Sequence, residues 1–288
     1  MGVVERITLQ APRLTTAERK VAEVLAAEPQ AIAFGTVAQV ARRAATSGPS
    51  VIRLAVKLGY DGFVDMQADV QSELARQLGP ARDRIRQRPP THLVHRVLAA
   101  ELDNVARTLR AVDTAVLERA VGHLSDRRRQ VWVLPGEVTL PIGLTLSGQL
   151  GQLRDGVTLL AGSEVAIGRA LGGLEGQDIL IAIDVRRYER SLVRLSRWSV
   201  TQGARLIALT DNPLSPLAGP AHEAFFLSAQ GVGPFDSMAG GLALANALVA
   251  GVAARLRPSA TARLDGTEAA WAAADALVAE PGGSAPLT

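Results

Sequence analysis

The side chains best suited to chemistry in the first third of the chain lie in one short stretch, from Ser47 to Lys57. Arg53 and Lys57 are cations, Ser47 and Ser50 carry hydroxyl groups, and Gly48 has no side chain. Cations and hydroxyls bind phosphates and base edges, and small residues let a helix N-terminus approach them closely. We interpret Ser47, Gly48, Ser50, Arg53 and Lys57 as a candidate DNA-binding set.

Two short helices with a tight connection are predicted to position this set, within residues 36–59. Thr36 and Gln39 fit a capping box at the start of the first helix, and Ser47 stands at the N-cap position of the second. At about 100° per residue, the apolar residues of the second helix share one arc, and its polar residues lie roughly 120° away. This is the layout of a helix-turn-helix. A plain solvated face would give the same pattern, so the residues alone leave both interpretations open.

The composition bounds the classes of protein to which the chain can belong. A length of 288 residues, 48% of them hydrophobic, suffices for two domains with sizeable cores. The absence of cysteine excludes disulfides, thiolate catalysis and Cys-ligated zinc. His92 and His95 have no acidic or further histidine neighbours, so we expect no metal site and no cofactor.

Two features argue against a membrane or secreted protein. The N-terminus carries Glu5 and Arg6 and lacks the apolar core of a signal peptide. The longest apolar stretch, Met238 to Ala254, contains Asn246 and several glycines, so it is interpreted as a buried helix. We therefore expect a cytoplasmic protein without a membrane partner.

Breaks in the hydrophobic pattern divide the chain into domains. Helical spacing continues to about Leu78, so residues 1–78 are predicted to form an all-α domain. Gly-Pro and Pro-Pro pairs then enclose an arginine-rich stretch, which we interpret as a linker over residues 79–90. A long helix from Thr91 carries apolar residues at three- and four-residue steps, which suits packing on a sheet or on a partner subunit.

Short apolar runs alternate with helical segments after that helix. This pattern predicts an α/β domain with a five-stranded parallel sheet flanked by helices over residues 91–256, followed by a C-terminal helix and tail over 257–288. Ligands of such sheets bind at the carboxyl ends of the strands. The five runs are residues 131–134, 157–160, 179–183, 205–210 and 224–228.

Three stretches of the N-terminal domain resemble the RpiR-type transcriptional regulators. Leu14–Ala22 follows their pattern L-T-x-A-E-R-x-V-A, Ser47–Arg53 follows S-x-x-x-V-x-R, and Lys57–Phe63 follows K-L-G-[FY]-x-G-F. The resemblance implies a helix-turn-helix that binds a double-stranded DNA operator. Ala45 stands where the family often has glycine, so a positive φ at this position would be mildly strained.

From about Leu93 to Leu256 the chain resembles the SIS (sugar isomerase) domain, the usual second domain of these regulators. The clearest match is Leu206–Ala218, which follows I-A-[IL]-T-D-x-x-x-S-P-L-A. The resemblance implies that this domain senses a small anionic metabolite, such as a sugar phosphate or a sugar-derived acid. A lone recognition helix covers too few base pairs for useful specificity, so we also expect a homodimer or homotetramer in which the second domain supplies the interface.

Two loops depart from the SIS pattern. After the first strand, Pro135 and Glu137 interrupt the expected G-x-G-x-S, and only Thr139 keeps a hydroxyl. After the third strand, the family's S-x-S-G-x-[TS] is replaced by a stretch in which Arg187 could bind a carboxylate or phosphate in a bidentate manner and Tyr188 could stack or donate. The candidate effector-binding set is Thr139, Asp184, Arg187, Tyr188, Thr210 and Ser215.

Several alternatives stay open at this point. Internal pairs, Asp184 with Arg187 or Glu137 with Arg186, would describe a domain that has lost its ligand. No acid and base can be assigned for ene-diol chemistry, so we expect no catalytic residues and no enzyme. The chain is therefore interpreted first as a ligand-responsive DNA-binding regulator, then as a DNA-binding regulator with a silent SIS-like domain, and last as a sugar-phosphate isomerase. The effector and the operator sequence do not follow from the residues.

Overall fold

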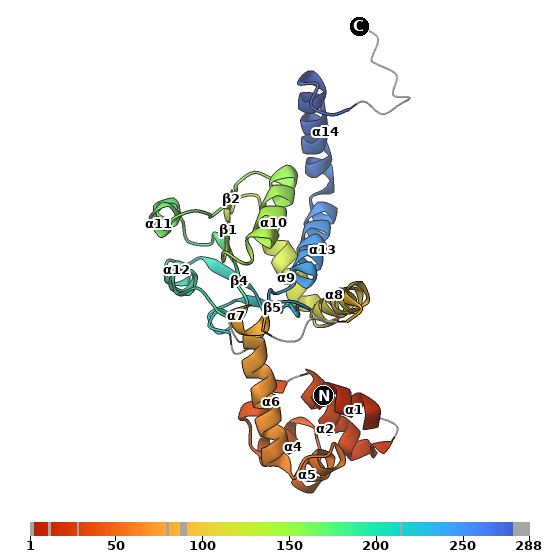
Figure 1. Cartoon of the computed structure of the whole chain (residues 1–288). Helices are drawn as coiled ribbons and strands as arrows, with labels where there is room; N and C mark the ends of the chain where they lie inside the picture. Colours follow the sequence, from red (N-terminus) through yellow and green to blue (C-terminus); the bar gives the residue numbers. More distant parts are fainter. Residues whose placement is uncertain are drawn as a thin grey trace. The chain divides into compact units, whose positions relative to one another are not determined.

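The computed structural model describes residues 3–10, 13–27, 29–78, 81–86, 91–213 and 215–278. The chain divides into two compact units, residues 1–89 and 90–288 (Figure 1). The first unit is all α and the second is α/β, which is the fold class that the sequence predicts.

The first unit packs its helices around one apolar core, and two of its helices begin with a capping box. Thr15 exchanges hydrogen bonds with Glu18 at the start of α2, and Thr36 does so with Gln39 at the start of α4. Val51 and Leu54 of α5 are fully buried in this core. The helices are α1 (Val3–Gln10), α2 (Thr16–Ala27), α3 (Pro29–Phe34), α4 (Val37–Arg43), α5 (Gly48–Lys57), α6 (Phe63–Leu78) and α7 (Ala81–Arg84).

The turn between α4 and α5 contains a residue in the left-handed region. Ala45 has φ of 46°, as expected from its place in the turn, and its Cβ makes this conformation less favourable than it is for glycine. Ser47 is the N-cap of α5, but its hydroxyl makes no capping hydrogen bond to the helix backbone. The stretch expected as a linker, residues 79–90, contains the short helix α7, and residues 79, 80 and 87–90 lie outside the described residues.

The second unit is built on a parallel sheet in the order β2-β1-β3-β4-β5. Each of the five predicted apolar runs overlaps one strand. All five residues of the central strand β3 are buried, because helices cover both faces of the sheet. The strands are β1 (Val131–Pro135), β2 (Val157–Leu159), β3 (Ile179–Ile183), β4 (Arg205–Thr210) and β5 (Glu223–Phe226).

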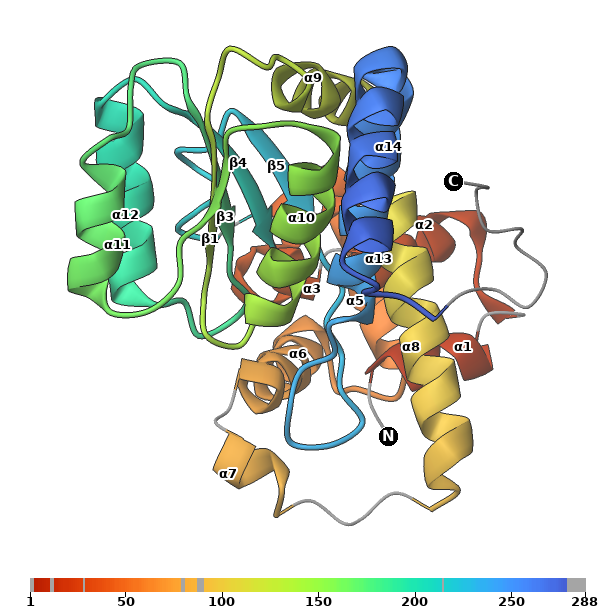
Figure 2. The same ribbon diagram turned by 90° about the horizontal axis from the view of Figure 1, so that it is seen from above.

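The helices form one layer on each side of this sheet (Figure 2). On one face, α9, α10 and α13 share a core with the odd-numbered residues of β3, and on the other face α11 and α12 cover Leu180 and Ala182. The alternation of side chains along the strand separates these two cores. The helices are α8 (Leu93–Arg110), α9 (Thr114–Leu124), α10 (Leu140–Leu153), α11 (Glu164–Leu171), α12 (Arg190–Thr201), α13 (Ala239–Arg255) and α14 (Arg257–Ala273).

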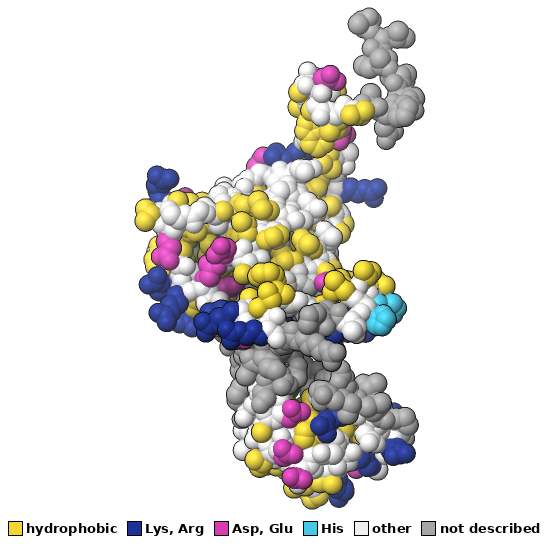
Figure 3. Space-filling view, in the orientation of Figure 1, with side chains coloured by type: hydrophobic (Ala, Val, Ile, Leu, Met, Phe, Trp, Pro, Cys, Tyr) yellow, Lys and Arg dark blue, Asp and Glu magenta, His cyan; other side chains and the backbone are white. Residues whose placement is uncertain are grey.

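Helix α8 buries polar residues and exposes apolar ones. Asn104 and Thr108 are fully buried against α13 and the segment after β5. The Asn104 side chain bonds to both backbone groups of Gln230, and Thr108 accepts from the amide of Ser228. The apolar stripe therefore does not pack on the sheet, and Figure 3 shows hydrophobic side chains along α8. The exposed members of this stripe are Leu93, Val94, Val97, Leu98, Leu102 and Leu109.

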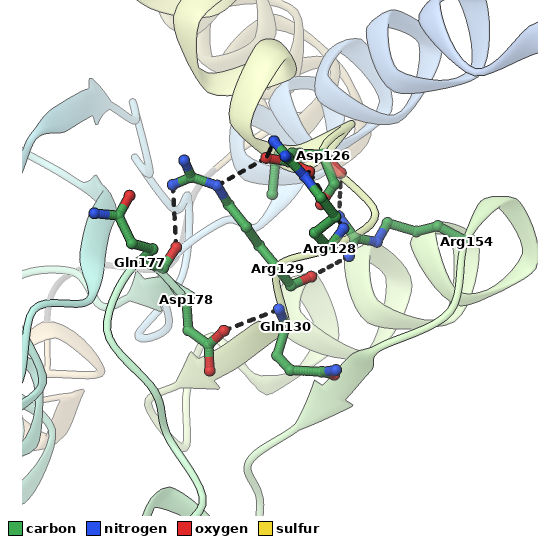
Figure 4. Close-up of polar contacts among 8 residues, drawn as sticks. Asp126, Arg128, Arg129, Gln130, Arg154, Gln177 and Asp178 are labelled. Atoms are coloured by element: carbon green, nitrogen blue, oxygen red, sulfur yellow. Dashed lines mark hydrogen bonds and ion pairs between the residues drawn. The ribbon is translucent and has the colours of Figure 1, made fainter.

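A polar network holds the edge of the sheet where the strands begin (Figure 4). Arg154, at the end of α10, is buried and donates to the carbonyls of Leu124, Asp126 and Arg129. Asp178, just before β3, accepts from the Gln130 amide at 3.0 Å. These contacts join the start of β1 to that of β3, and the ladder between the two strands continues to Pro135 and Ile183 at their other ends.

The two C-terminal helices, α13 and α14, pack on other helices of the second unit. α13 is buried against α8, α9 and α10, as the sequence predicts for this stretch, and α14 packs on α10. Among the described residues no single helix is long and apolar enough to cross a membrane, and α13 with α14 satisfies length and composition only across a bend of 104°.

Candidate DNA interface and effector site

The packed face of α5 includes one residue that the sequence placed on the DNA side. Ser50 is only 2% exposed. Its Oγ accepts a hydrogen bond from Arg53 Nη2 at 3.0 Å and lies 3.0 Å from Ser47 Oγ. Ser50 therefore orients the Arg53 guanidinium, and its own side chain is buried on the packed face of α5 with Val51 and Leu54.

Lys57 makes contacts within the first unit that the sequence did not predict. Its Nζ donates to Glu18 Oε2 at 2.7 Å and to the carbonyl of Arg13 at 3.0 Å. Glu18 is 3% exposed, so the pair joins α5 to the start of α2 inside the unit. Burial raises the pKa of the Glu18 carboxyl, but the hydrogen bonds from Lys57 and Thr15 outweigh it and hold the pKa below its ordinary value.

The exposed face of α5 is more apolar than expected. Arg53 is exposed, as are Ile52 and Val56, which are 45% and 56% exposed. Sequence reasoning missed these two residues because it looked for polar groups opposite the buried arc. The helical period itself was the signal that could have found them, since it places Ile52 and Val56 about 100–140° from Val51.

In the second unit the strand order has a topological switch point between β1 and β3. The chain leaves β1 toward β2 on one side and continues from β3 to β4 on the other, so the order reverses between these neighbours. Ligands of open parallel sheets bind at such a point, at the carboxyl ends of the strands. Thr139 Oγ1 donates to the carbonyl of Ile183 at 2.6 Å and joins the loop after β1 to the end of β3.

At this point, side-chain carboxylates of the chain accept hydrogen bonds from backbone amides. Asp184 is 3% exposed and accepts from the amides of Val185 at 2.9 Å and Glu189 at 2.7 Å. The carboxylate of Glu189 in turn accepts from the amide of Glu137. A Cβ at Gly136 would lie 2.9 Å from Asp184 Oδ1, so glycine alone leaves room for this carboxylate.

The buried position of Asp184 changes its titration. Burial raises the pKa of its carboxyl to about 6, although the amides of Glu189 and Val185 favour the ionised form. The nearby carboxylates of Glu189 and Asp211 raise the pKa further. A group with this pKa changes charge near neutral pH.

Tyr188 and the predicted hydroxyl residues are held by contacts within the domain. The Tyr188 hydroxyl donates to Asp211 Oδ1 and accepts from Asn212 Nδ2 at 2.9 Å. Burial, then the hydrogen bond to Asp211, raises the pKa of Tyr188. Thr210 Oγ1 donates to Ser215 Oγ at 2.7 Å, and both residues are buried, as is Thr139. These three hydroxyls support the loops from inside.

The two neighbouring arginines of the loop after β3 have different surroundings. Arg186 has φ of 58°, and its guanidinium lies 3.1 Å from Asp236 Oδ1 and donates to the carbonyl of Ala229. Arg187 is exposed and has no hydrogen bond or ion pair to any described residue. The internal pairs that the sequence left open, Asp184 with Arg187 and Glu137 with Arg186, are not the contacts that these residues make.

Within the described part of the chain, no group of three or more His, Asp and Glu side chains could hold a metal ion. The two units together define a class: an N-terminal helix-turn-helix unit followed by an α/β unit whose loops converge at a switch point. Residues 1–77 match the helix-turn-helix domain of the rpiR family. The first unit is therefore a helix-turn-helix domain of the rpiR family, and the second unit has the SIS fold.

Known relatives and structures resemble both units. The HTH-type transcriptional regulator HexR of Pseudomonas aeruginosa is 24% identical over 219 residues, which cover 75% of each protein. The bifunctional protein glk of Paraburkholderia xenovorans is 25% identical over 219 residues, which cover 75% of this chain but only 34% of that protein. The chain thus matches about a third of such glk proteins.

Two solved structures show the fold. The sugar isomerase domain of the RpiR transcription factor from Sphaerobacter thermophilus is 27% identical with a TM-score of 0.57, and the match covers 62% of this chain and 99% of that one. The Vibrio vulnificus NanR protein complexed with ManNAc-6P has a TM-score of 0.55 at 17% identity, over 94% of this chain and 98% of NanR. At that identity the likeness to NanR concerns the fold alone.

Proposed function

We propose that the chain is a transcriptional regulator that binds a double-stranded DNA operator through α5 and responds to a small molecule bound by its SIS domain. The observation that carries this proposal is the exposed end and outer face of α5, where Arg53 is oriented by Ser50 beside the small residues at the helix start. A cation held in place on an exposed recognition helix suits a base edge or a phosphate. A regulator of this kind acts in the cytoplasm, where the DNA lies.

A second copy of the chain is the proposed partner of α8. The apolar stripe from Leu93 to Leu109 is exposed to water, whereas Asn104 and Thr108 of the same helix are buried. An exposed apolar surface of this kind is typical of a protein–protein interface. Pairing of two stripes would bury it and give a homodimer, or a homotetramer if α14 adds a second contact. Operators would then contain two related half-sites about 10 base pairs, or a multiple of that, apart.

The proposed effector is a small anion, a sugar phosphate or a sugar-derived acid, that contacts Arg187. Three amides at the switch point are already taken by Asp184 and Glu189, so a ligand anion has few free amide donors there. The Arg187 guanidinium is exposed and has no described partner, and it can hold a carboxylate or phosphate through two parallel hydrogen bonds. Tyr188 borders this place and is proposed to contact the ligand as well.

One observation favours a second candidate, a sugar-phosphate isomerase: Asp184 has a pKa of about 6, which suits an acid or base. Both of its oxygens, however, accept from backbone amides of its own loop, and the residue is only 3% exposed, so Asp184 supports the loop and has little access to a substrate. We therefore propose no enzymatic role. A DNA-binding regulator with a silent SIS domain is the remaining alternative, and a ligand screen separates it from the first proposal.

Binding of the full chain to duplexes selected from a random-sequence pool tests the DNA proposal. We expect Arg53→Ala to weaken binding of the selected duplex by about 1–3 kcal/mol. Binding of a random duplex should be weakened much less, because a base contact carries sequence preference. Arg19→Ala on α2, an exposed site with the same loss of charge, is the matched control and should keep the preference. Equal selectivity of Arg53→Ala and the wild-type chain would exclude Arg53 as the base-reading residue.

A further inference from the structure

Ile52 and Val56 are exposed apolar side chains that the packing of the first unit does not use. They lie one turn apart on α5, 45% and 56% exposed, while Val51 and Leu54 of the same helix are fully buried. Large apolar side chains left in water cost free energy that burial against a partner would recover. Two such residues on the outer face of α5, next to Arg53, therefore point to a partner.

The charges around these residues identify the class of partner. The segment from Thr36 to Tyr60 contains the cations Arg42, Arg43, Arg53 and Lys57 and no carboxylate. The three arginines are exposed, whereas Lys57 is engaged with Glu18. An exposed apolar strip in a segment whose charged side chains are all cations is complementary to a polyanion that also offers apolar groups.

Thymine offers such a group in the major groove of DNA, where its 5-methyl is the one apolar feature of the base edges. We propose that Ile52 and Val56 contact thymine methyl groups and thereby determine part of the operator sequence. This inference rests on the proposed DNA-binding role of α5 and adds which bases are read and by which side chains. Arg53, held by Ser50 between them along the helix, would contact a neighbouring base or phosphate.

The test uses the full chain and a duplex that it selects from a random-sequence pool. Each thymine of the selected duplex is replaced in turn by uracil, which removes the 5-methyl and keeps the base pairing. At the contacted positions we expect wild-type affinity to fall about fourfold per methyl, as for burial of one such group. In Ile52→Ala/Val56→Ala, thymine and uracil duplexes should bind alike at those positions.

The matched control is Val64→Ala, which removes an exposed β-branched side chain, 77% exposed, from α6 of the same unit. It should keep the wild-type ratio of thymine to uracil affinities. A ratio near one at every position in the wild-type chain, a selected duplex without thymine, or an unchanged ratio in the Ile52/Val56 variant would each overturn the inference. Failure of the wild-type chain to select any duplex would overturn both the proposed DNA binding and this inference. The other outcomes would overturn only the thymine contacts and leave the proposed DNA binding standing.

Discussion

Lys57 Nζ lies 2.7 Å from Glu18 Oε2, so the last turn of α5 is tied to the first turn of α2 across 39 positions of the sequence. Because the carboxylate is buried and the ammonium is its partner, this pair supports the angle at which α5 is presented. Lys57 thereby acts within the unit, and the outer face of α5 is left to Ile52, Arg53 and Val56.

We therefore expect Lys57→Ala to reduce stability rather than DNA affinity. Loss of a hydrogen bond to a charged, buried carboxylate should lower the free energy of unfolding by about 1–3 kcal/mol. Urea unfolding followed by far-UV circular dichroism measures this change. Weaker DNA binding by a variant of unchanged stability would restore Lys57 to the phosphate-binding set.

The same pair predicts a pH dependence. The pKa of Glu18 in the folded state lies below its ordinary value, so its stabilising contribution is complete above that ordinary value and is lost as the pH falls through the folded pKa. Wild-type stability should therefore fall on acidification by more than that of Glu18→Gln. Urea titrations of both proteins between pH 7 and pH 3 give the comparison, and parallel curves would contradict it.

The raised pKa of Asp184 predicts the opposite dependence of stability on pH in the second unit. Its folded pKa of about 6 lies above the ordinary value of 3.8, so the folded state holds the proton longer and loses stability as pH rises between these values. Relative to wild type, Asp184→Asn should gain on the order of 3 kcal/mol from pH 4 to pH 7, with the change complete soon above pH 6. Its absolute stability is also lowered, because an amide side chain can accept at only one of the two backbone N–H groups.

Tryptophan fluorescence can follow this unit by itself, since Trp132, Trp198 and Trp271 are the chain's three tryptophans and all lie in it. A difference between the Asp184→Asn and wild-type proteins that does not change with pH would show that Asp184 titrates normally.

Arg187→Ala should abolish the effect of an anionic effector on DNA affinity and leave ligand-free DNA binding unchanged. The two proposed sites lie in different units, so loss of the Arg187 contact removes no proposed DNA contact. Thermal shifts of the full chain with hexose phosphates, pentose phosphates and sugar acids identify a binding anion, which is then tested in the DNA assay. Arg187→Lys should rescue poorly, because an ammonium cannot form the bidentate pair.

Arg190→Ala, at the exposed start of α12, removes the same charge nearby and serves as the control for Arg187. If ligand response survives in Arg187→Ala, or is lost equally in Arg190→Ala, then the effector lies elsewhere or is bound by general charge alone.

Leu98→Glu/Leu102→Glu should convert the full chain to a monomer. The two residues are 55% and 63% exposed on α8, so the substitutions leave the fold of the monomer intact and place like charges in the proposed interface. Light scattering coupled to size exclusion measures the mass. Val165→Glu on α11, at a site 82% exposed, should leave the oligomer unchanged, and a wild-type monomer at micromolar concentration would refute the interface.

Much of this protein follows from local sequence. The capping box at Thr36, the turn at Ala45 and the five apolar runs predict the two-domain fold because hydrogen-bonding side chains and hydrophobic periods act within a few residues of the chain. The family patterns add the class of protein, since they cover both domains.

The tertiary structure alone decided which face of each helix is covered and which polar groups pair over long distances. Periodicity defines the arcs of α8, for example, but not that Asn104 and Thr108 face the loop after β5 while the leucines face water. Likewise the contacts of Lys57 with Glu18 and of Glu189 with the Glu137 amide join positions 39 and 52 residues apart. Such pairings depend on where the folded backbone places each donor and acceptor, and this information lies in the packing of the whole domain.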